Sequence, residues 1–158
     1  MLNKEALFSS AKSDWCTPPE LFHALDEEFN FTCDVAADDT NALCPVYHTK
    51  ETSALEAKWD GVCYCNPPYG RDIGLWVEKA LIEAMAGRAT TVMLLPARTD
   101  TRWFHAYIWP FRQVEVRFIK SRLKFVGAKS SAPFPSMVVI FRTNIPINLP
   151  IKRRAQDV

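Results

Sequence analysis

The sequence predicts an α/β protein whose mostly parallel sheet is covered by helices on both faces and has a reversed last strand. Apolar runs typical of buried strands alternate with segments whose apolar residues repeat at helical spacing. The last two strand-like runs, residues 114–119 and 136–142, have only a loop between them, so they can pair antiparallel. At 158 residues, 48% of them hydrophobic, the chain has the size of one domain with a sizeable core.

The helices follow from apolar spacing and from start signals. The first is expected over residues 18–29, because prolines fall in its first turn and Thr17 is a candidate N-cap. A second is expected within residues 70–87. A third is expected over residues 99–108, capped by Thr99 or Asp100.

The strands are expected where short apolar runs are bounded by polar or turn residues. These runs are residues 31–36, 62–65, 91–95, 114–119 and 136–142. Between the first two strands, residues 37–60 are polar and irregular, with a short helix expected around Asn41 and a short strand at residues 46–47. Residues 120–135 are expected to form a long loop.

The tetrapeptide Asn66-Pro67-Pro68-Tyr69 directly follows the second strand-like run. Two successive prolines cannot continue a sheet, because each lacks a backbone N–H, so the strand ends there. Ligands of open α/β sheets bind at such carboxyl ends. The Asn66 side-chain oxygen and the Pro67 carbonyl are two acceptors in a rigid frame for a planar amino group, and the Tyr69 ring offers a face for stacking. We therefore expect Asn66, Pro67 and Tyr69 to be catalytic residues.

Further motifs stand in a fixed order around this tetrapeptide. They are Asp14-Trp15-Cys16-Thr17-Pro18-Pro19, Asp34-Val35-Ala36-Ala37, Asn41-Ala42, Trp59, Trp76, Leu94-Leu95-Pro96-Ala97-Arg98-Thr99, Trp103-Phe104 and Ser121-Arg122-Leu123-Lys124-Phe125. The tetrapeptide is similar to the catalytic motif of S-adenosylmethionine-dependent amino-methyltransferases, which methylate adenine in DNA or RNA or glutamine in proteins. The whole order, over roughly residues 14–142, resembles the phage-type Dam-like DNA adenine methyltransferases.

This resemblance implies a compact Rossmann-like methyltransferase fold over residues 14–143, with a lead-in at 1–13 and a basic tail at 144–158. It implies methyl transfer from S-adenosylmethionine to the exocyclic amine of a site in double-stranded DNA, with the adenine flipped out and stacked on Tyr69. We expect a monomer or weak homodimer in the cytoplasm of a bacterial or phage-infected cell. Two alternatives stay open: an enzyme acting on RNA or on a protein glutamine, and a non-catalytic nucleic-acid-binding module.

The cofactor site implied by the resemblance departs from the wider methyltransferase pattern, because no glycine follows Asp34. Small side chains at Ala36 and Ala37 are expected to allow the close approach instead. The expected cofactor-binding residues are Trp15, Thr17, Pro18, Asp34, Ala36, Asn41 and Asn66. A ribose-binding acid is expected at Glu51 or Glu56. Trp15 and Trp59 are either cofactor contacts or core residues, and Trp76 is expected in the core.

The net charge of +1 hides a division along the chain. Residues 1–97 carry 7 Lys or Arg against 15 Asp or Glu, a balance of −8, whereas residues 98–158 carry 12 against 3, a balance of +9. Because cations are interleaved with aromatic residues after residue 97, we expect a DNA-recognition region at 98–135; the alternative is chance segregation on a solvated surface. The expected DNA-binding residues are Arg98, Arg102, Lys120, Arg122 and Lys124.

The remaining composition argues against several classes of protein. No run of eighteen apolar residues is present, so no membrane span is expected. The five cysteines form no Cys-x-x-Cys pair and have no zinc-ligand spacing with the histidines, so we expect reduced thiols and no metal site. We expect Cys63 and Cys65, which alternate with Tyr64 on a strand, to face opposite sides of the sheet.

Overall fold

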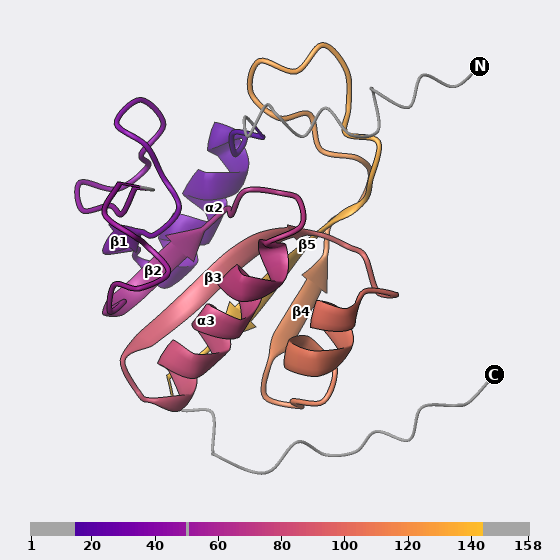
Figure 1. The fold of residues 1–158 in the computed structure, drawn as a ribbon. Helices are drawn as coiled ribbons and strands as arrows, with labels where there is room; N and C mark the ends of the chain where they lie inside the picture. Colours follow the sequence, from indigo (N-terminus) through magenta and orange to yellow (C-terminus); the bar gives the residue numbers. More distant parts are fainter. Residues whose placement is uncertain (1–14, 50, 144–158) are drawn as a thin grey trace, which may run out of the picture.

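The computed structural model describes residues 15–49 and 51–143, and in these ranges one five-stranded sheet has the order β1-β2-β3-β5-β4 (Figure 1). The strands are β1 (Cys33–Asp34), β2 (Gly61–Cys65), β3 (Ala89–Pro96), β4 (Glu115–Phe118) and β5 (Ser136–Phe141). β1, β2 and β3 pair in parallel, whereas β5 is antiparallel to both β3 and β4. The predicted mostly parallel sheet with a reversed last strand is confirmed. The expected lead-in at 1–13 and tail at 144–158 lie outside the described residues.

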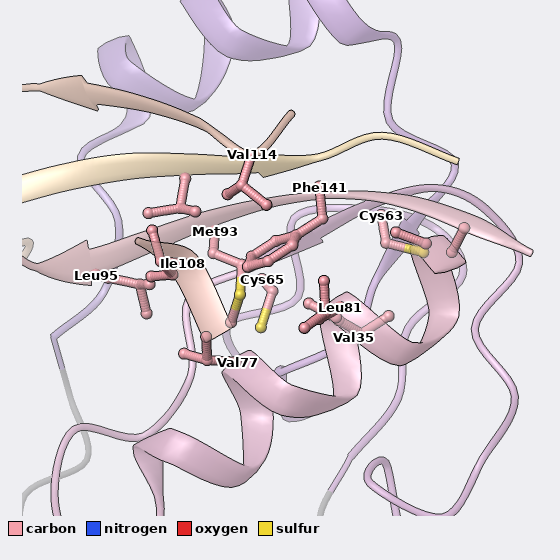
Figure 2. Packing of buried hydrophobic residues seen from close by; sticks show 14 of the residues in the cluster. Val35, Cys63, Cys65, Val77, Leu81, Met93, Leu95, Ile108, Val114 and Phe141 are labelled. Atoms are coloured by element: carbon pink, nitrogen blue, oxygen red, sulfur yellow. The ribbon is translucent and has the colours of Figure 1, made fainter. Parts of the chain in front are cut away.

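Helices cover both faces of this sheet, as expected. Helix α3 (Ile73–Met85) and the short π-helix η1 (Phe104–Ile108) pack on one face, and α2 (Pro19–Phe29) packs on the other. In Figure 2, Val77 and Leu81 of α3 point toward the strands and meet Met93 and Leu95 of β3. The intervening β3 residues face the α2 side, because side chains alternate along a strand.

The cysteines of β2 correct one expectation. Cys63 and Cys65 both belong to the α3-side core, whereas Tyr64 between them belongs to the α2-side core. The prediction that the two cysteines face opposite sides is wrong, since residues two apart on a strand share a face. The neighbour that takes the other face is therefore the tyrosine, and this brings its side chain to the segment that precedes α2.

The helix starts differ from the predicted ones. The N-cap of α2 is Pro18 and no side chain caps it, so Thr17 is not the cap that its position suggests. At the predicted 99–108 helix, the Phe104 N–H donates to Thr101 Oγ1 at 3.4 Å, so neither Thr99 nor Asp100 caps this segment. The element that the structure has in this segment is the shorter π-helix Phe104–Ile108, in which the Trp109 N–H donates to the Phe104 carbonyl at 2.9 Å.

The region around β1 is also more irregular than its pattern suggests. The predicted strand 31–36 shortens to two residues, because the Phe31 N–H donates to Asp26 Oδ1 at 2.8 Å and the Ala36 N–H to Asp34 Oδ1 at 3.2 Å. The short helix expected at Asn41 is a turn. The short strand expected at residues 46–47 is present as a single parallel bridge between Tyr47 and Asp34.

A buried carboxylate ties the end of α3 to the start of β3. Glu83 is fully buried, and it pairs with Lys79 on the same helix and with Arg88 just before β3. Burial raises the pKa of Glu83, but the hydrogen bonds from Arg88 and Lys79 outweigh that effect and hold the pKa below its usual 4.5. The ion pairs therefore stabilise the fold above the unfolded-state pKa, and this stabilisation is lost as the pH falls through the folded-state pKa.

We expect Glu83→Gln to lower the free energy of unfolding near neutral pH by about 1–3 kcal/mol, because Lys79 and Arg88 lose a charged, desolvated partner. Urea unfolding followed by circular dichroism measures this, and the difference from wild type should shrink when the pH is lowered below 4.5. Glu27→Gln, at an exposed position of α2, is the matched control and should change little. Equal losses for the two variants would contradict the assignment.

Candidate active site

A cavity of about 960 Å³ opens at the carboxyl ends of β1 and β2. Its wall contains six of the seven residues predicted to bind a cofactor: Trp15, Thr17, Asp34, Ala36, Asn41 and Asn66. Pro18, the seventh, is not among the described lining residues, although it is buried beside them as the N-cap of α2. Motifs that are distant in the sequence thus share one cavity, at the sheet edge where ligands of α/β proteins bind.

The Asn66 side chain is fixed by two hydrogen bonds to the segment before α2. Its Nδ2 donates to the Trp15 carbonyl at 2.5 Å and to Thr17 Oγ1 at 3.1 Å. A carbonyl can only accept, so the amide nitrogen must face Trp15. The Asn66 Oδ1 atom is consequently turned away from these partners, and it is buried without a hydrogen-bond partner among the described residues. A buried acceptor without a partner is rare in folded proteins and calls for an explanation, such as a donor supplied by a ligand.

The Asp34 carboxylate lies at the end of β1, where it is almost fully buried. The Ala36 N–H donates to its Oδ1 at 3.2 Å, and the Leu43 N–H donates to its Oδ2 at 3.1 Å. Burial raises the pKa of Asp34, and these two backbone bonds offset only part of the effect. The carboxylate therefore organises two turns of the cavity wall and also places a poorly solvated negative charge beside the cavity.

Tyr69 belongs to an aromatic cluster next to the cavity. Its ring centroid lies 6.3 Å from that of Phe125 and 5.6 Å from that of Phe134, both edge-on, and its hydroxyl donates to the Leu94 carbonyl at 3.1 Å. Trp15 packs on the same two phenylalanines at 5.2 and 5.3 Å. Tyr69 is not among the described lining residues, whereas Trp15 is both a cluster member and part of the wall. Trp15 therefore both lines the cavity and packs in the aromatic cluster, so the two alternatives expected for it are not exclusive.

Of the other residues considered as cofactor contacts, some line the cavity and one does not. Glu51 and Glu56 both line the cavity, but Trp59 is fully buried and its indole N–H donates to the Ala54 carbonyl at 2.9 Å. Trp76, expected in the core, stacks on Trp59 and also lines the cavity. Asn41 lines it as well, with its amide hydrogen-bonded to Asp38.

Tyr64 and Val126 also line the cavity, and the sequence analysis assigned neither to the site. Tyr64 carried one signal, since a tyrosine on a buried strand usually has a hydroxyl partner. Val126 carried none. It reaches the cavity from the loop between β4 and β5 by pairing with Cys16, whose carbonyl accepts from the Val126 N–H at 3.0 Å.

Comparison with known proteins decides the family. The family model of DNA N-6-adenine-methyltransferase (Dam) matches residues 4–155. The chain belongs to the Dam family. It is 29% identical over 154 residues to a DNA N-6-adenine-methyltransferase of Haemophilus phage HP1, covering 92% of this chain and 88% of that protein. It is 36% identical over 93 residues to a DNA N-6-adenine-methyltransferase of Escherichia phage T1, covering 57% of this chain and 38% of that protein.

Two sets of cations in this Dam-family chain differ in their ion pairing. Arg117 and Arg142 are ion-paired with Glu115, and Arg117 also with Glu28 of α2, on the outer part of the sheet. Within residues 15–49 and 51–143, the five cations expected to bind DNA form no ion pair and are exposed: Arg98, Arg102, Lys120, Arg122 and Lys124. The second group is therefore available to a polyanion.

The loop between β4 and β5 has the alternation that its sequence suggests. Lys120, Arg122 and Lys124 are exposed, whereas Phe125 is buried and Leu123 packs against the α2-side core. In Figure 1 this loop lies beside the start of α2, as the Cys16–Val126 bridge requires. The cations are thus held on a loop whose other residues contact the cavity and its aromatic cluster.

Two negative findings hold for the part of the chain that the structure describes. No helix there is long and apolar enough to cross a membrane. No cluster of three or more His, Cys, Asp or Glu residues suited to a metal ion occurs there either.

Proposed function

We propose that this chain is a site-specific DNA methyltransferase that transfers a methyl group from S-adenosylmethionine to the exocyclic amine of adenine in duplex DNA. The observation that carries the proposal is the Asn66 Oδ1 atom, a buried acceptor that has no partner among the described residues and belongs to a residue of the cavity wall. The match to the Dam family model supports adenine in DNA as the target. We also propose that the sheet, with β5 antiparallel to its neighbours, is a Rossmann-like methyltransferase fold over residues 14–143.

The residues of the cavity fit S-adenosylmethionine. The molecule carries a sulfonium cation, which favours a site with poorly solvated negative charge, and Asp34 supplies such a charge. Glu51 and Glu56 at the wall are candidate acceptors for ribose hydroxyls. Trp15 and Trp76 offer apolar surface for the adenosine, and the small side chain of Ala36 leaves room where other methyltransferases carry glycine.

The mechanism that we propose rests on two acceptors. S-Adenosylmethionine, when bound, supplies an activated methyl group. The Asn66 Oδ1 atom and the Pro67 carbonyl would each accept one N–H of the adenine amine. Such bonds oppose delocalisation of the nitrogen lone pair into the ring, so the nitrogen becomes more nucleophilic. Because Trp15 and Thr17 hold the Asn66 amide before the substrate arrives, little reorganisation is needed.

Access to the amine requires that the adenine leave the duplex, since its Watson–Crick edge is paired there. We propose that the flipped base stacks on Tyr69. The hydroxyl bond to the Leu94 carbonyl and the edge contacts with Phe125 and Phe134 fix the orientation of this ring. Base–aromatic stacking is worth about 1–3 kcal/mol, which offsets part of the lost base stacking.

The DNA would be gripped by residues 98–135, through the exposed cations Arg98, Arg102, Lys120, Arg122 and Lys124. Arg98 also lies over the Phe134 ring, 6.0 Å from its centroid, so it connects this surface with the aromatic cluster. We propose that a chain of this size acts as a monomer or weak homodimer on DNA in a bacterial or phage-infected cell.

Asn66→Ala tests the catalytic proposal. We expect the rate of methyl transfer to fall by about 10²–10³, corresponding to about 2.7–4 kcal/mol, while cofactor affinity changes little. Transfer of labelled methyl groups to duplex DNA, RNA and protein, measured for wild type and variant, gives both the substrate class and the loss. Ser136→Ala is the control. It removes a buried hydroxyl of the sheet that also has no hydrogen-bond partner among the described residues, and it should leave the rate unchanged. A near wild-type rate for Asn66→Ala would refute the assignment.

Asp34 should make cofactor binding depend on pH. Because burial raises the pKa of Asp34, its carboxylate is protonated at a higher pH than an exposed aspartate, and the attraction to the cation is then lost. Calorimetry should therefore show S-adenosylmethionine affinity falling as the pH is lowered toward that pKa. Asp34→Asn should bind more weakly at neutral pH and show a flatter pH profile, with DNA affinity less affected. The same pH profile in wild type and variant would exclude Asp34 as the source.

The double variant Arg122→Ala/Lys124→Ala tests the DNA surface. It should weaken binding to many DNA sequences alike and reduce the slope of log affinity against log salt by about one unit for each lost phosphate contact. Fluorescence anisotropy over a salt series measures both effects. Arg117→Ala/Arg142→Ala removes two cations that are already ion-paired and should leave the slope unchanged. Equal slopes for wild type and the first variant would place the DNA elsewhere.

A further inference from the structure

Tyr64 has a hydroxyl that its packing does not explain. Its side chain is fully buried among the rings of the α2-side core, with centroids 5.2 Å from Phe22 and 5.3 Å from Phe31. A phenylalanine would make the same ring contacts. Burying a hydroxyl is costly unless it forms a hydrogen bond, so the partner of this one matters.

That partner is Thr17. The distance between the Tyr64 hydroxyl oxygen and Thr17 Oγ1 is 2.6 Å, and Thr17 is only 6% exposed. Thr17 does not cap α2, so its hydroxyl is left for this contact and for the Asn66 amide, which donates to it at 3.1 Å. The three side chains form one relay from the core of the sheet to the wall of the cavity.

The relay constrains the direction of the Asn66 oxygen. Thr17 Oγ1 accepts one amide hydrogen and the Trp15 carbonyl accepts the other, so both donors of the Asn66 amide are engaged. A Thr17 side chain that rotates away would release one of them. Tyr64 opposes that rotation, because its own ring is packed inside the α2-side core, where it contacts Phe22.

We infer that Tyr64 is a positioning residue for methyl transfer: through the Thr17 hydroxyl it fixes the Asn66 amide so that Oδ1 faces the substrate amine. This inference rests on the proposed function of Asn66. It also gives Thr17 a different role from the cofactor contact that the family resemblance implies. The cofactor pocket and the catalytic amide then share one internal support.

Kinetics of Tyr64→Phe test the inference. We expect kcat for adenine methylation to fall about threefold to tenfold, as for the loss of one buried hydrogen bond, with KM for S-adenosylmethionine unchanged. Thr17→Val should reduce kcat similarly, and Tyr64→Phe should cost nothing further in that background. Thr17→Ser, which keeps the hydroxyl, should lose much less of kcat than Thr17→Val. Losses that multiply in the double variant, or a change in KM alone, would overturn the inference.

A packing control separates the hydroxyl from the ring. Phe31→Leu removes a ring that contacts Tyr64, so it should lower the melting temperature while kcat, measured well below that temperature, stays at the wild-type value. A fall in kcat equal to that of Tyr64→Phe would mean that packing alone is responsible, and the inference would fail.

A readout without turnover keeps this inference separate from the proposed function. In NMR spectra of the ligand-free protein, the side-chain amide signals of Asn66 can be assigned by their loss in Asn66→Ala. Their chemical shifts should change in Tyr64→Phe and stay the same in Phe31→Leu. Unshifted signals in Tyr64→Phe would overturn the relay. A wild-type chain that transfers no methyl group to adenine would instead refute the proposed function, while the amide signals still decide on the relay.

Discussion

The arrangement of the site depends on the hydrogen bonds from the Asn66 amide to Trp15 and Thr17. They join the end of β2 to the segment before α2, two regions about fifty residues apart in the sequence. They also fix the amide nitrogen toward Trp15, because the Trp15 carbonyl can only accept, and this leaves Oδ1 without a hydrogen-bond partner among the described residues. An asparagine without them would be free to present either a donor or an acceptor, and the preference for an amino group that we propose would be lost.

The aromatic cluster extends this constraint to the loop between β4 and β5. Trp15 and Tyr69 pack against Phe125 and Phe134, and the Cys16–Val126 bridge lies beside them. A loop without helix or strand is thereby held by buried side chains at one defined place, as is common for functional loops on rigid scaffolds. The cations that we propose for DNA contact are consequently fixed relative to the amide that we propose for catalysis.

Negative and positive charges lie on different parts of the molecule. The cavity wall carries carboxylates, including the buried Asp34, whereas the five exposed cations that we propose for DNA contact lie after residue 97. A cationic cofactor and an anionic nucleic acid require opposite potentials, and a chain of this size can provide both only on separate surfaces. The ion pairs of Arg117 and Arg142 show that the basic half is not uniformly available, which composition alone could not reveal.

The element order and the reversed β5 were predictable from the sequence, because apolar periodicity and the loop before the last strand are local signals. The ordered motifs indicated the family. The ordered motifs also contain the residues predicted to bind a cofactor, and six of these seven line the cavity wall. Three features became visible only in the folded chain: Thr17 bonds Asn66 and does not cap α2, Tyr64 bonds Thr17, and Val126 reaches the cavity. Hydrogen-bond partners far apart in the chain are selected by how the layers pack, and no local pattern encodes that choice.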